Sequence, residues 1–262
     1  MNSKLLIEKN FSRYAESYDE YCGVQNLCAE ELISKIGPKG FKGILDIGCG
    51  TGNFTRLLKE KFPNAELTAI DISHDMLRIA KDKFKEGGVE FLEKDAETVR
   101  LNKRFDLLSS NATLQWMDDL ERSLVSYKEM LREGGAIWFS IFGQNTFPEL
   151  SCAIKEVFGK DARVSASDFT KYDDLKRMMD DHFKDVYVEE KVYQERYGRI
   201  KELLDRIRFT GTRGWGAGSG VIWTRKRIDE LESVYIKRFG EIRATYQVFF
   251  CGGNKPTLMP SP

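Results

Sequence analysis

The sequence has few residues that could carry metal or disulfide chemistry. It holds two histidines, His74 and His182, in 262 residues. Its five cysteines, at positions 22, 28, 49, 152 and 251, form no CxxC pair and no Cys/His spacing of a zinc site. An odd number of scattered cysteines also does not make a disulfide framework. We therefore expect no metal site, and a protein of the reducing cytoplasm.

Long hydrophobic runs and an excess of charge are missing as well. No segment approaches the roughly 18 uncharged apolar residues of a membrane span, and the start of the chain does not resemble a signal peptide. Lys and Arg together number 41, as do Asp and Glu, so the formal net charge is zero. This balance argues against attraction of the whole molecule to nucleic acid. We expect no membrane or nucleic-acid partner, and a monomer.

The chain does contain alternating strand and helix patterns. Short apolar runs predict buried strands at residues 43–48, 66–71, 89–95, 105–111 and 136–142. Helical spacing between them, with Ser73 as a cap of one helix, predicts helices at residues 54–62, 76–84 and 119–132. This order predicts an α/β fold with a parallel sheet covered by helices on both faces.

The flanking segments extend this pattern into a single domain over residues 1–252. Further helices are expected at residues 4–19, 24–35, 147–158, 170–181, 199–209 and 227–239, and further strands at 183–193 and 244–250. The core sheet would occupy about 40–145 and 183–250. The helices of 4–35 and an insertion at 196–240 would cover the active site. Residues 253–262 are rich in Gly and Pro, and we expect a disordered tail there.

A glycine-rich turn follows the first predicted strand, in the order Asp46, Ile47, Gly48, Cys49, Gly50, Thr51 and Gly52. Alternate glycines let the chain turn sharply and approach a ligand closely, and the next helix offers free N–H groups. An ordinary turn and a dinucleotide site are the alternatives. The dinucleotide fingerprint is GxGxxG, however, and here Asn53 stands where its third glycine would be. Asp46 would repel a pyrophosphate but suits an amino group and a sulfonium, which indicates S-adenosylmethionine.

Polar residues also end the next three predicted strands. Asp71 follows Gly52 by 19 residues, where a carboxylate can accept hydrogen bonds from a ribose diol. Asp95, followed by Ala96, could accept one from the adenine amino group, and Asn111 would lie near the transferred methyl group. Carboxyl ends of parallel strands meet at one crevice, so these side chains should converge on one ligand. Ile72 and Met76 complete the predicted cofactor site.

These motifs resemble those of the class I S-adenosylmethionine-dependent methyltransferases. The resemblance covers roughly residues 40–145 and rests on the DIGCGTG segment, Asp71-Ile72-Ser73, Asp95-Ala96 and the order of strands and helices. It implies a Rossmann-like, seven-stranded sheet whose last strand is antiparallel. It also implies that N-terminal helices and a helical insertion before the last strand cover the active site.

Three flanking segments resemble one family within that class, the malonyl-acyl-carrier-protein O-methyltransferases of biotin synthesis. They are Asn10-Phe11-Ser12-Arg13 with Ala15, Tyr18 and Asp19; residues 111–119, NATLQWMDD; and residues 203–211 with 245–250. The resemblance reaches nearly to Phe250, and the glycine-rich residues 211–220 and the tail from Cys251 depart from it. It implies methylation of the free carboxylate of a malonyl thioester on acyl carrier protein or coenzyme A. S-adenosylmethionine would be the donor and S-adenosylhomocysteine the product.

The chemistry of that reaction limits the catalytic residues it needs. A carboxylate with a pKa of about 4 is already ionised at pH 7, so it needs no general base. It does need a cationic partner, for which Arg208 is the leading candidate because it lies in the insertion, ahead of Arg13 and Arg213. Tyr18 is expected to close over the methionine end of the cofactor. Gln115 and Trp116 are expected to line the methyl-transfer region.

Two alternatives remain open, and the charge distribution bears on the partner. The chain could methylate a free carboxylic acid or a quinone precursor, or it could bind the cofactor without catalysis. Residues 191–262 carry 14 Lys+Arg against 7 Asp+Glu. This basic end suits an acidic carrier protein. It includes Arg206, Arg208, Arg213, Arg225, Lys226 and Arg227.

Overall fold

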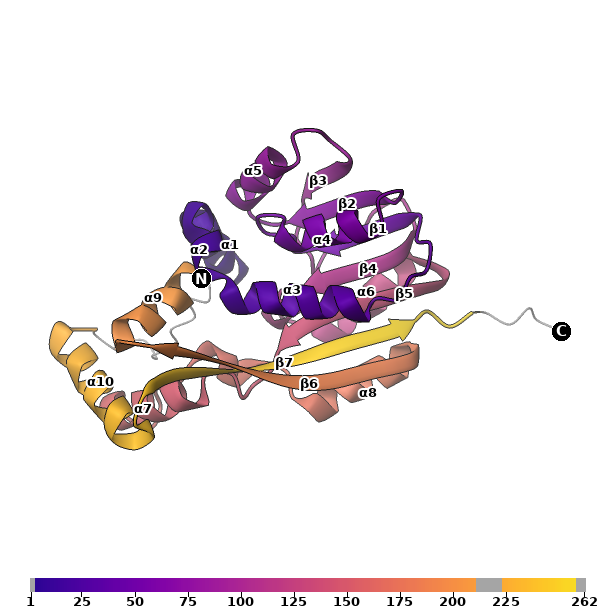
Figure 1. The fold of residues 1–262 in the computed structure, drawn as a ribbon. Helices are drawn as coiled ribbons and strands as arrows, with labels where there is room; N and C mark the ends of the chain where they lie inside the picture. Colours follow the sequence, from indigo (N-terminus) through magenta and orange to yellow (C-terminus); the bar gives the residue numbers. More distant parts are fainter. Residues whose placement is uncertain (1–2, 211–222, 258–262) are drawn as a thin grey trace.

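The computed structural model describes residues 3–210 and 223–257. The glycine-rich segment 211–220, with Arg213, and the last five residues lie outside the described residues. Within them, seven strands form one sheet in the order β3-β2-β1-β4-β5-β7-β6 (Figure 1). The strands are β1 (Gly43–Ile47), β2 (Glu66–Asp71), β3 (Val89–Glu93), β4 (Phe105–Asn111), β5 (Leu131–Phe142), β6 (Lys184–Tyr197) and β7 (Ile242–Asn254).

The strand directions confirm the predicted topology. The pairs of β1 with β2 and β4, of β2 with β3, and of β4 with β5 are parallel. β7 is antiparallel to both of its neighbours, β5 and β6. The sheet is therefore mostly parallel with an antiparallel last strand, and the carboxyl ends of β1 to β4 lie at one edge.

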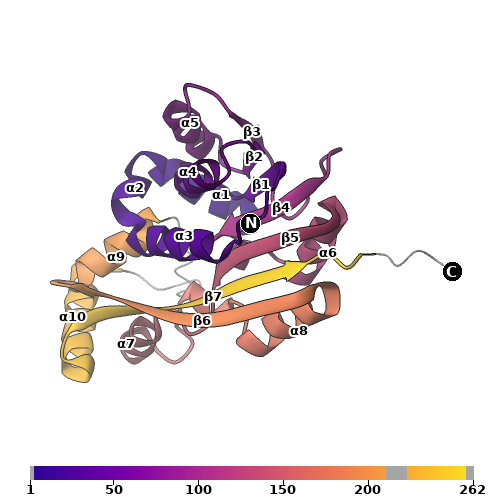
Figure 2. The ribbon, with the colours of Figure 1, turned by 45° about the vertical axis from the view of Figure 1, so that its right-hand side comes forward.

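Helices cover both faces of the sheet because successive strand residues point to opposite sides. Ile44 belongs to the core under α3 (Gly23–Lys35) and α4 (Asn53–Lys61). Leu45 belongs to the core under α6 (Leu120–Met130) and α8 (Tyr172–His182). Figure 2 shows these helices on the two sides of the sheet. All five residues of β1 are buried, as expected for a strand packed on both faces.

Polar caps fix where several helices begin. The Ser73 hydroxyl accepts a hydrogen bond from the backbone N–H of Met76 at 3.3 Å and starts α5 (His74–Lys83), which confirms the predicted cap. Asp119 caps α6 in the same way by accepting from the N–H of Arg122 at 2.9 Å. These caps set the loops that leave the carboxyl ends of β2 and β4.

The N-terminal helix is interrupted, which corrects the continuous helix expected over residues 4–19. The segment consists of α1 (Ser3–Tyr14), the 3-10 turn η1 (Ala15–Ser17) and α2 (Tyr18–Tyr21). The bend lets the chain follow the edge of the sheet, where Glu16 pairs with Arg78 and Asp19 pairs with Lys83. Tertiary contacts therefore override the helical spacing of the sequence.

The last strands are longer than the sequence pattern indicated. β6 and β7 pair from Lys184 with Asn254 to Tyr197 with Ile242. Asn254 also pairs with Ala136 of β5. Gly253 and Asn254 thus belong to the sheet, although a disordered tail was expected from residue 253. β5 begins at Leu131, five residues before the strand expected at 136–142, so Gly134 and Gly135 lie inside it.

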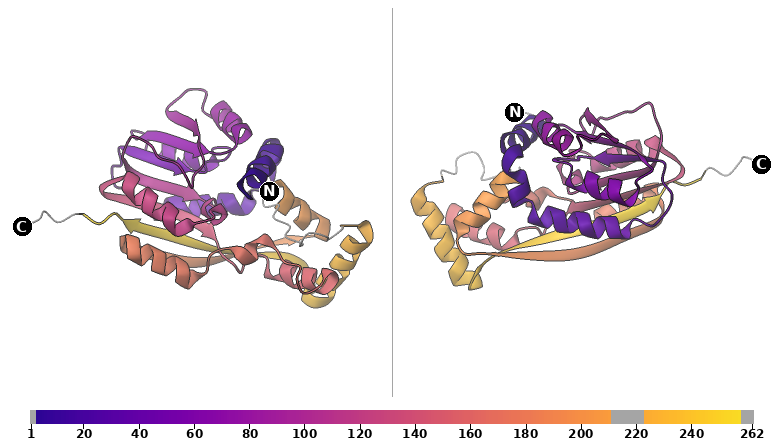
Figure 3. Two further views of the ribbon diagram at one scale, coloured as in Figure 1. Left: turned by 180° about the vertical axis from the view of Figure 1, so that it is seen from behind. Right: turned by 45° about the horizontal axis from the view of Figure 1, so that its top comes forward.

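The remaining helices gather at the far end of the β6–β7 ribbon. They are α7 (Pro148–Phe158), α9 (Ile200–Phe209) and α10 (Arg225–Phe239). Two short turns complete the described elements, η2 (Leu114–Trp116) after β4 and η3 (Ser165–Asp168) after α7. Figures 1 and 3 show α1, α2 and α9 beyond the carboxyl ends of the parallel strands. They cover the edge where a ligand would bind. In the described residues, no helix is both long and apolar enough to cross a membrane.

Candidate functional site

A cavity with about 970 Å³ of empty space lies at the carboxyl ends of β1 to β4. This space includes the open mouth of the cavity. Most of the residues expected to form the cofactor site line it: Tyr18, Gly48, Cys49, Gly50, Thr51, Asp71, Ile72, Met76, Asp95, Ala96, Asn111 and Trp116. Asp46, Gly52, Gln115 and Arg208 do not line it.

The glycine-rich turn forms one wall of the cavity. Gly48 has a φ of +70°, and a Cβ there would lie 2.2 Å from the Thr113 side chain, so no larger residue fits. Gly50 has a φ of +53° with open space where its Cβ would be. A ligand in the cavity can therefore come close to the backbone at Gly50. Gly52, also at positive φ, precedes α4 and packs against Ala80 and Phe84 instead of the cavity.

Asp71 presents its carboxylate from the end of β2. Its Oδ2 accepts a hydrogen bond from the Gly50 N–H and its Oδ1 accepts one from the Ser73 N–H, both at 2.9 Å. Burial raises the pKa of this carboxyl, and the backbone N–H donors counteract part of that rise. The two N–H groups fix the carboxylate, and its remaining lone pairs can accept hydrogen bonds from a ligand.

Asp46 lies at the end of β1, behind the glycine-rich turn. It is fully buried, and its Oδ2 accepts a hydrogen bond from the Thr55 hydroxyl at 2.6 Å. Its Oδ1 has no hydrogen-bond partner within the described residues. Burial raises the pKa of this carboxyl to about 7. Such a group gains stability from a nearby positive charge.

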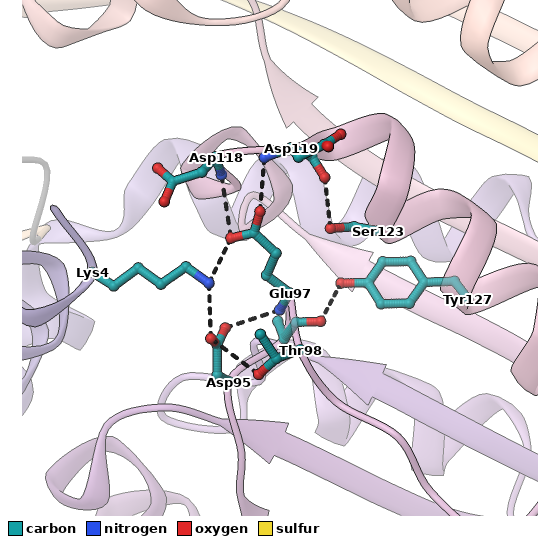
Figure 4. Close-up of polar contacts among 9 residues, drawn as sticks. Lys4, Asp95, Glu97, Thr98, Asp118, Asp119, Ser123 and Tyr127 are labelled. Atoms are coloured by element: carbon teal, nitrogen blue, oxygen red, sulfur yellow. Dashed lines mark hydrogen bonds and ion pairs between the residues drawn. The ribbon is translucent and has the colours of Figure 1, made fainter. Parts of the chain in front are cut away.

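Asp95 is held by an ion-pair network from α1 (Figure 4). Lys4 Nζ lies 2.8 Å from Asp95 Oδ2 and 2.5 Å from Glu97 Oε2. These partners lower the pKa of both carboxyls, against the effect of burial. Glu97 also accepts the backbone N–H groups of Asp118 and Asp119. The network connects the loops after β3 and β4 to the N-terminal helix.

A second polar network joins α2 to the glycine-rich turn. Asp19 Oδ1 accepts hydrogen bonds from the Thr51 hydroxyl at 2.6 Å and from Asn53 Nδ2 at 3.1 Å. Its Oδ2 pairs with Lys83 at 2.6 Å. Asn53, which replaces the third glycine of a dinucleotide fingerprint, thus serves to anchor the N-terminal segment over the turn.

Aromatic side chains form the wall nearest to Asn111. The ring centroid of Phe11 lies 6.4 Å from that of Tyr18 and 6.3 Å from that of Trp116. Burial raises the pKa of Tyr18 far above its usual value, so its phenol stays protonated. Asn111 donates a hydrogen bond to the Gln25 carbonyl at 3.0 Å. An apolar wall with a few fixed polar groups suits a reaction that must exclude water.

Gln115 lies behind this wall. Its Nε2 donates a hydrogen bond to the Ala112 carbonyl at 2.7 Å, and its buried Oε1 has no partner among the described residues. The side chain therefore faces the loop after β4 rather than the cavity. His74 and His182 lie on α5 and α8, and neither lines the cavity.

A second, mostly apolar cavity adjoins the first. The two share Gln25 and Trp116 in their walls. The second cavity is closed mainly by η3, α7, α9 and β7, through Phe147, Leu150, Ala166, Phe169, Ile207, Thr210 and Tyr246. The shared wall places this apolar space beside the aromatic end of the first cavity.

Arg208 lies at the end of α9, next to Ile207 of the second cavity. Its Nε donates a hydrogen bond to the Tyr14 hydroxyl at 3.0 Å, and its Cζ lies 5.9 Å from the Tyr14 ring centroid. Arg13 lies over the same ring, with its Cζ at 5.6 Å. Two of the three arginines proposed to bind a carboxylate thus surround Tyr14. The third, Arg213, lies outside the described residues.

Sequence reasoning missed several lining residues. Lys4, Ile7 and Phe11 line the cavity with Tyr18 and follow the three- and four-residue spacing of one helix face. That spacing was visible in the sequence, but the pattern did not say which ligand or surface the face would meet. Thr113 and Met117 also line the cavity; they belong to the 111–119 segment used for the family resemblance, but no role was assigned to them. Gln25 and Asn26 line it too, and no signal in the sequence identified them.

Solved structures share this fold. Phosphoethanolamine N-methyltransferase 2 of Haemonchus contortus, solved with S-adenosyl-L-methionine, is 19% identical, with a TM-score of 0.58 over 93% of this chain and 57% of its own. An S-adenosylmethionine-dependent methyltransferase of Thermotoga maritima is 21% identical, with a TM-score of 0.56 over 95% and 99% of the two chains. At such identities the likeness concerns the fold alone.

Sequence comparisons are more specific. The family described as "Methyltransferase domain" matches residues 44–135. Malonyl-[acyl-carrier protein] O-methyltransferase 2 of Ilyobacter polytropus is 35% identical over 91% of this chain and 92% of its own. The malonyl-[acyl-carrier protein] O-methyltransferase of Acetivibrio thermocellus is 32% identical over 97% and 95% of the two chains. Because these likenesses cover nearly the whole sequence, the chain belongs to the malonyl-[acyl-carrier protein] O-methyltransferase family.

Proposed function

We infer that this protein methylates the free carboxylate of malonyl-[acyl-carrier protein] with S-adenosylmethionine, an early step of biotin synthesis. The observation that carries this conclusion is the likeness to malonyl-[acyl-carrier protein] O-methyltransferases along 91% to 97% of the chain. The likeness extends beyond the methyltransferase domain of residues 44–135 and so includes the segments that cover the site. The likeness therefore supports the proposed substrate as well as the cofactor.

The residues of the first cavity fit S-adenosylmethionine. Behind the glycine-rich turn, outside the cavity lining, Asp46 keeps a buried carboxylate oxygen without a partner in the described residues, which suits a positive charge bound nearby. Asp71 is fixed to accept hydrogen bonds from a ribose diol, and the space over Gly50 allows close approach. We assign Asp95 and Ala96 to the adenine end, and Tyr18 and Asn111 to the methionine end. Bound there, the cofactor supplies a methyl group made electrophilic by its sulfonium, and the electrons of the broken S–C bond stay on sulfur.

The chain itself contributes alignment and exclusion of water. The substrate carboxylate is ionised at neutral pH and forms the new C–O bond through one of its oxygens, so no proton has to be removed. Phe11, Tyr18 and Trp116 shield the reacting atoms from solvent. Holding the two reactants in line supplies a large part of the rate in such a reaction.

The second cavity gives the substrate a place beside the cofactor. We assign the thioester arm to this apolar space, so that the carboxylate meets the methyl group near Gln25 and Trp116, which both cavities share. Ile207 of α9 and Thr210, which follows the helix, border the same space. Arg208, between them in sequence, would then hold the carboxylate from the side of α9.

The cellular setting follows from the same proposal. All five cysteines are unpaired, which suits the reducing cytoplasm, where acyl thioesters are made. The partner is a carrier protein bearing malonate.

A substrate panel tests the function directly. Purified protein is supplied with S-adenosylmethionine and with malonyl-acyl carrier protein, malonyl-coenzyme A or free malonate, and methyl ester is measured by mass spectrometry. We expect turnover of the malonyl thioesters and little of free malonate. Efficient turnover of free malonate would instead assign the protein to free acids. Cofactor binding by calorimetry without transfer to any of them would identify a binding protein.

Replacing Arg208 by Ala tests the proposed carboxylate partner. We expect turnover of malonyl-acyl carrier protein to fall at least about a hundredfold, because a buried carboxylate loses a charge-assisted partner. The affinity for S-adenosylmethionine, measured by calorimetry, should stay within about twofold. Full turnover by the variant would eliminate Arg208 from this role.

A further inference from the structure

Tyr14 connects the N-terminal cover to the end of α9. It is the last residue of α1 and is 7% exposed. It lies three residues after Phe11 and four before Tyr18, both of which line the first cavity. The three-residue spacing places Phe11 and Tyr14 on one side of α1, whereas Tyr18 follows the bend at Ala15–Ser17. Tyr14 therefore lies beside the cavity wall without being part of it.

The contacts of Tyr14 hold Arg208 in one orientation. The Tyr14 hydroxyl accepts the Nε–H of Arg208 at 3.0 Å. A guanidinium carries five N–H donors, and this bond uses the single one on Nε. In residues 3–210 and 223–257, the Nη atoms of Arg208 donate no hydrogen bond, and no carboxylate pairs with it. The edge formed by the two Nη atoms therefore remains available for a bidentate carboxylate contact.

Aromatic packing keeps this arrangement rigid. Phe209, the neighbour of Arg208, meets the Tyr14 ring edge-on at 5.2 Å and stacks on the Tyr21 ring at 4.4 Å. Arg206 donates a hydrogen bond to the Tyr21 carbonyl at 2.6 Å. The end of α9 is thus fixed to the N-terminal segment on both sides of Arg208.

The electrostatics around Tyr14 favour an anion. Arg13 and Arg208 both lie within 6 Å of the ring centroid. Neither of them forms an ion pair with a carboxylate of the described residues. Two guanidinium groups that lie near one ring, neither paired with a carboxylate of the described residues, repel each other, and a bound carboxylate relieves that repulsion.

We propose that Tyr14 is a positioning residue for the substrate: its hydroxyl and ring orient Arg208 so that the Nη edge receives the malonyl carboxylate. This inference rests on the proposed function, because it assigns Arg208 to that carboxylate. Tyr14 touches neither the cofactor nor the reacting atoms. It acts on substrate binding through Arg208 and links that binding to closure of the N-terminal segment.

Replacing Tyr14 by Phe tests the proposal, because only the hydroxyl is removed. We expect KM for malonyl-acyl carrier protein to rise about tenfold, the size of effect typical of a lost hydrogen bond to a charged group. kcat should change less, and the affinity for S-adenosylmethionine should not change. Tyr21→Phe is the matched control, since Tyr21 belongs to the same aromatic cluster and, in the described residues, its hydroxyl forms no hydrogen bond with Arg208. Its KM and its Tm should stay close to those of the parent protein.

A double-mutant cycle separates positioning from mere packing. In an Arg208→Ala background, Tyr14→Phe should add no further loss, because Tyr14 then has nothing to orient. A loss that multiplies in this background, or a Tyr14→Phe variant with the KM of the parent protein, would overturn the proposal.

The same cycle distinguishes a wrong assignment of Arg208 from a wrong assignment of Tyr14. If Arg208→Ala alone keeps the parent KM, the assignment of Arg208 fails and the role of Tyr14 fails with it. If Arg208→Ala loses activity but Tyr14→Phe does not, the function stands and only the positioning role is wrong.

Discussion

The carboxyl group of Asp46 is fully buried, and only one of its two oxygens accepts a hydrogen bond within the described residues. Burial raises the pKa of Asp46 to about 7, so near neutral pH the free protein holds this group partly protonated. A positive charge nearby favours the ionised form. Binding of a cationic ligand is then linked to release of a proton from Asp46.

The affinity for S-adenosylmethionine should consequently depend on pH. Below the pKa of about 7 a proton competes with the cation for Asp46. We expect the affinity to fall by up to about tenfold for each pH unit below 7 and to level off above it. Calorimetry across this range measures the slope, and Asp46→Asn should bind more weakly with a flatter profile. An unchanged slope in that variant would show that another group titrates.

Single site residues could be identified from the sequence where they lie close together along the chain. The glycine spacing identified Gly48 and Gly50, which both have a positive φ, and at Gly48 the Thr113 side chain also leaves no room for a Cβ. It did not identify Lys4 as the partner of Asp95, because 91 residues separate them. No local pattern encodes which lysine a carboxylate will meet after the sheet has formed.

The helix α1 acts as a cover because one of its faces meets the cavity. Lys4, Ile7 and Phe11 line the cavity, and Lys4 forms ion pairs with Asp95 and Glu97. The Ser12 hydroxyl also meets the Ser73 hydroxyl at 2.8 Å. Release of a ligand from the cavity therefore requires some of these contacts to open.

Replacing Lys4 by Met should loosen this cover while keeping the length of the side chain. We expect S-adenosylmethionine to dissociate about three- to tenfold faster in stopped-flow measurements, because a partly buried ion pair is lost. High salt should narrow the difference by weakening the ion pairs of the parent protein. Lys9→Met is the control, since Lys9 is exposed on the same helix. Equal dissociation rates for both variants would contradict a covering role of Lys4.

Among whole elements, prediction failed where tertiary contacts act against local spacing. The residues of 4–19 have the spacing of one helix, yet the chain bends at Ala15–Ser17 to follow the sheet edge. The strands β1, β2 and β4 followed their patterns because continuous apolar runs are typical of strands buried on both faces. β3 also formed where its pattern indicated, but it lies at the edge of the sheet and is only partly buried. β6 was underestimated because its alternating burial belongs to an edge strand, whose end depends on its partner.

Across the whole molecule, not all basic side chains of residues 191–262 are available to a partner, because several already form ion pairs within the chain. Arg206 is engaged by Glu195 and the Tyr21 carbonyl, and Arg227 by Glu230. Arg225 and Lys226 are exposed at the start of α10. These two side chains are therefore the better candidates for contact with an acidic carrier protein.

Replacing Arg225 and Lys226 by Glu together tests docking of the carrier protein. A Glu is favourable at a helix N-terminus, so the fold of α10 should tolerate the change. We expect kcat/KM for malonyl-acyl carrier protein to fall about tenfold at low salt, with a smaller effect at high salt, and turnover of malonyl-pantetheine to be unaffected.

The matched control reverses the same charge elsewhere. Lys39 and Lys42 are exposed in the loop before β1, at the opposite end of the strands from the cavity. Changing both to Glu should leave kcat/KM and its salt dependence close to those of the parent protein. Equal losses in the two double variants would show a general effect of net charge and not a docking surface.

The sequence by itself determined the sheet, the glycine-rich turn and the acidic strand ends, because each depends on neighbouring residues or on short spacings. Only the tertiary structure decided which side chains from distant segments contact these parts. It placed Lys4 on Asp95, Asp19 on Thr51 and Tyr14 on Arg208, pairs that join segments 32 to 194 residues apart. Such pairs form only after the sheet brings its carboxyl ends and its covering helices together, so their partners follow from packing in space and not from order along the chain.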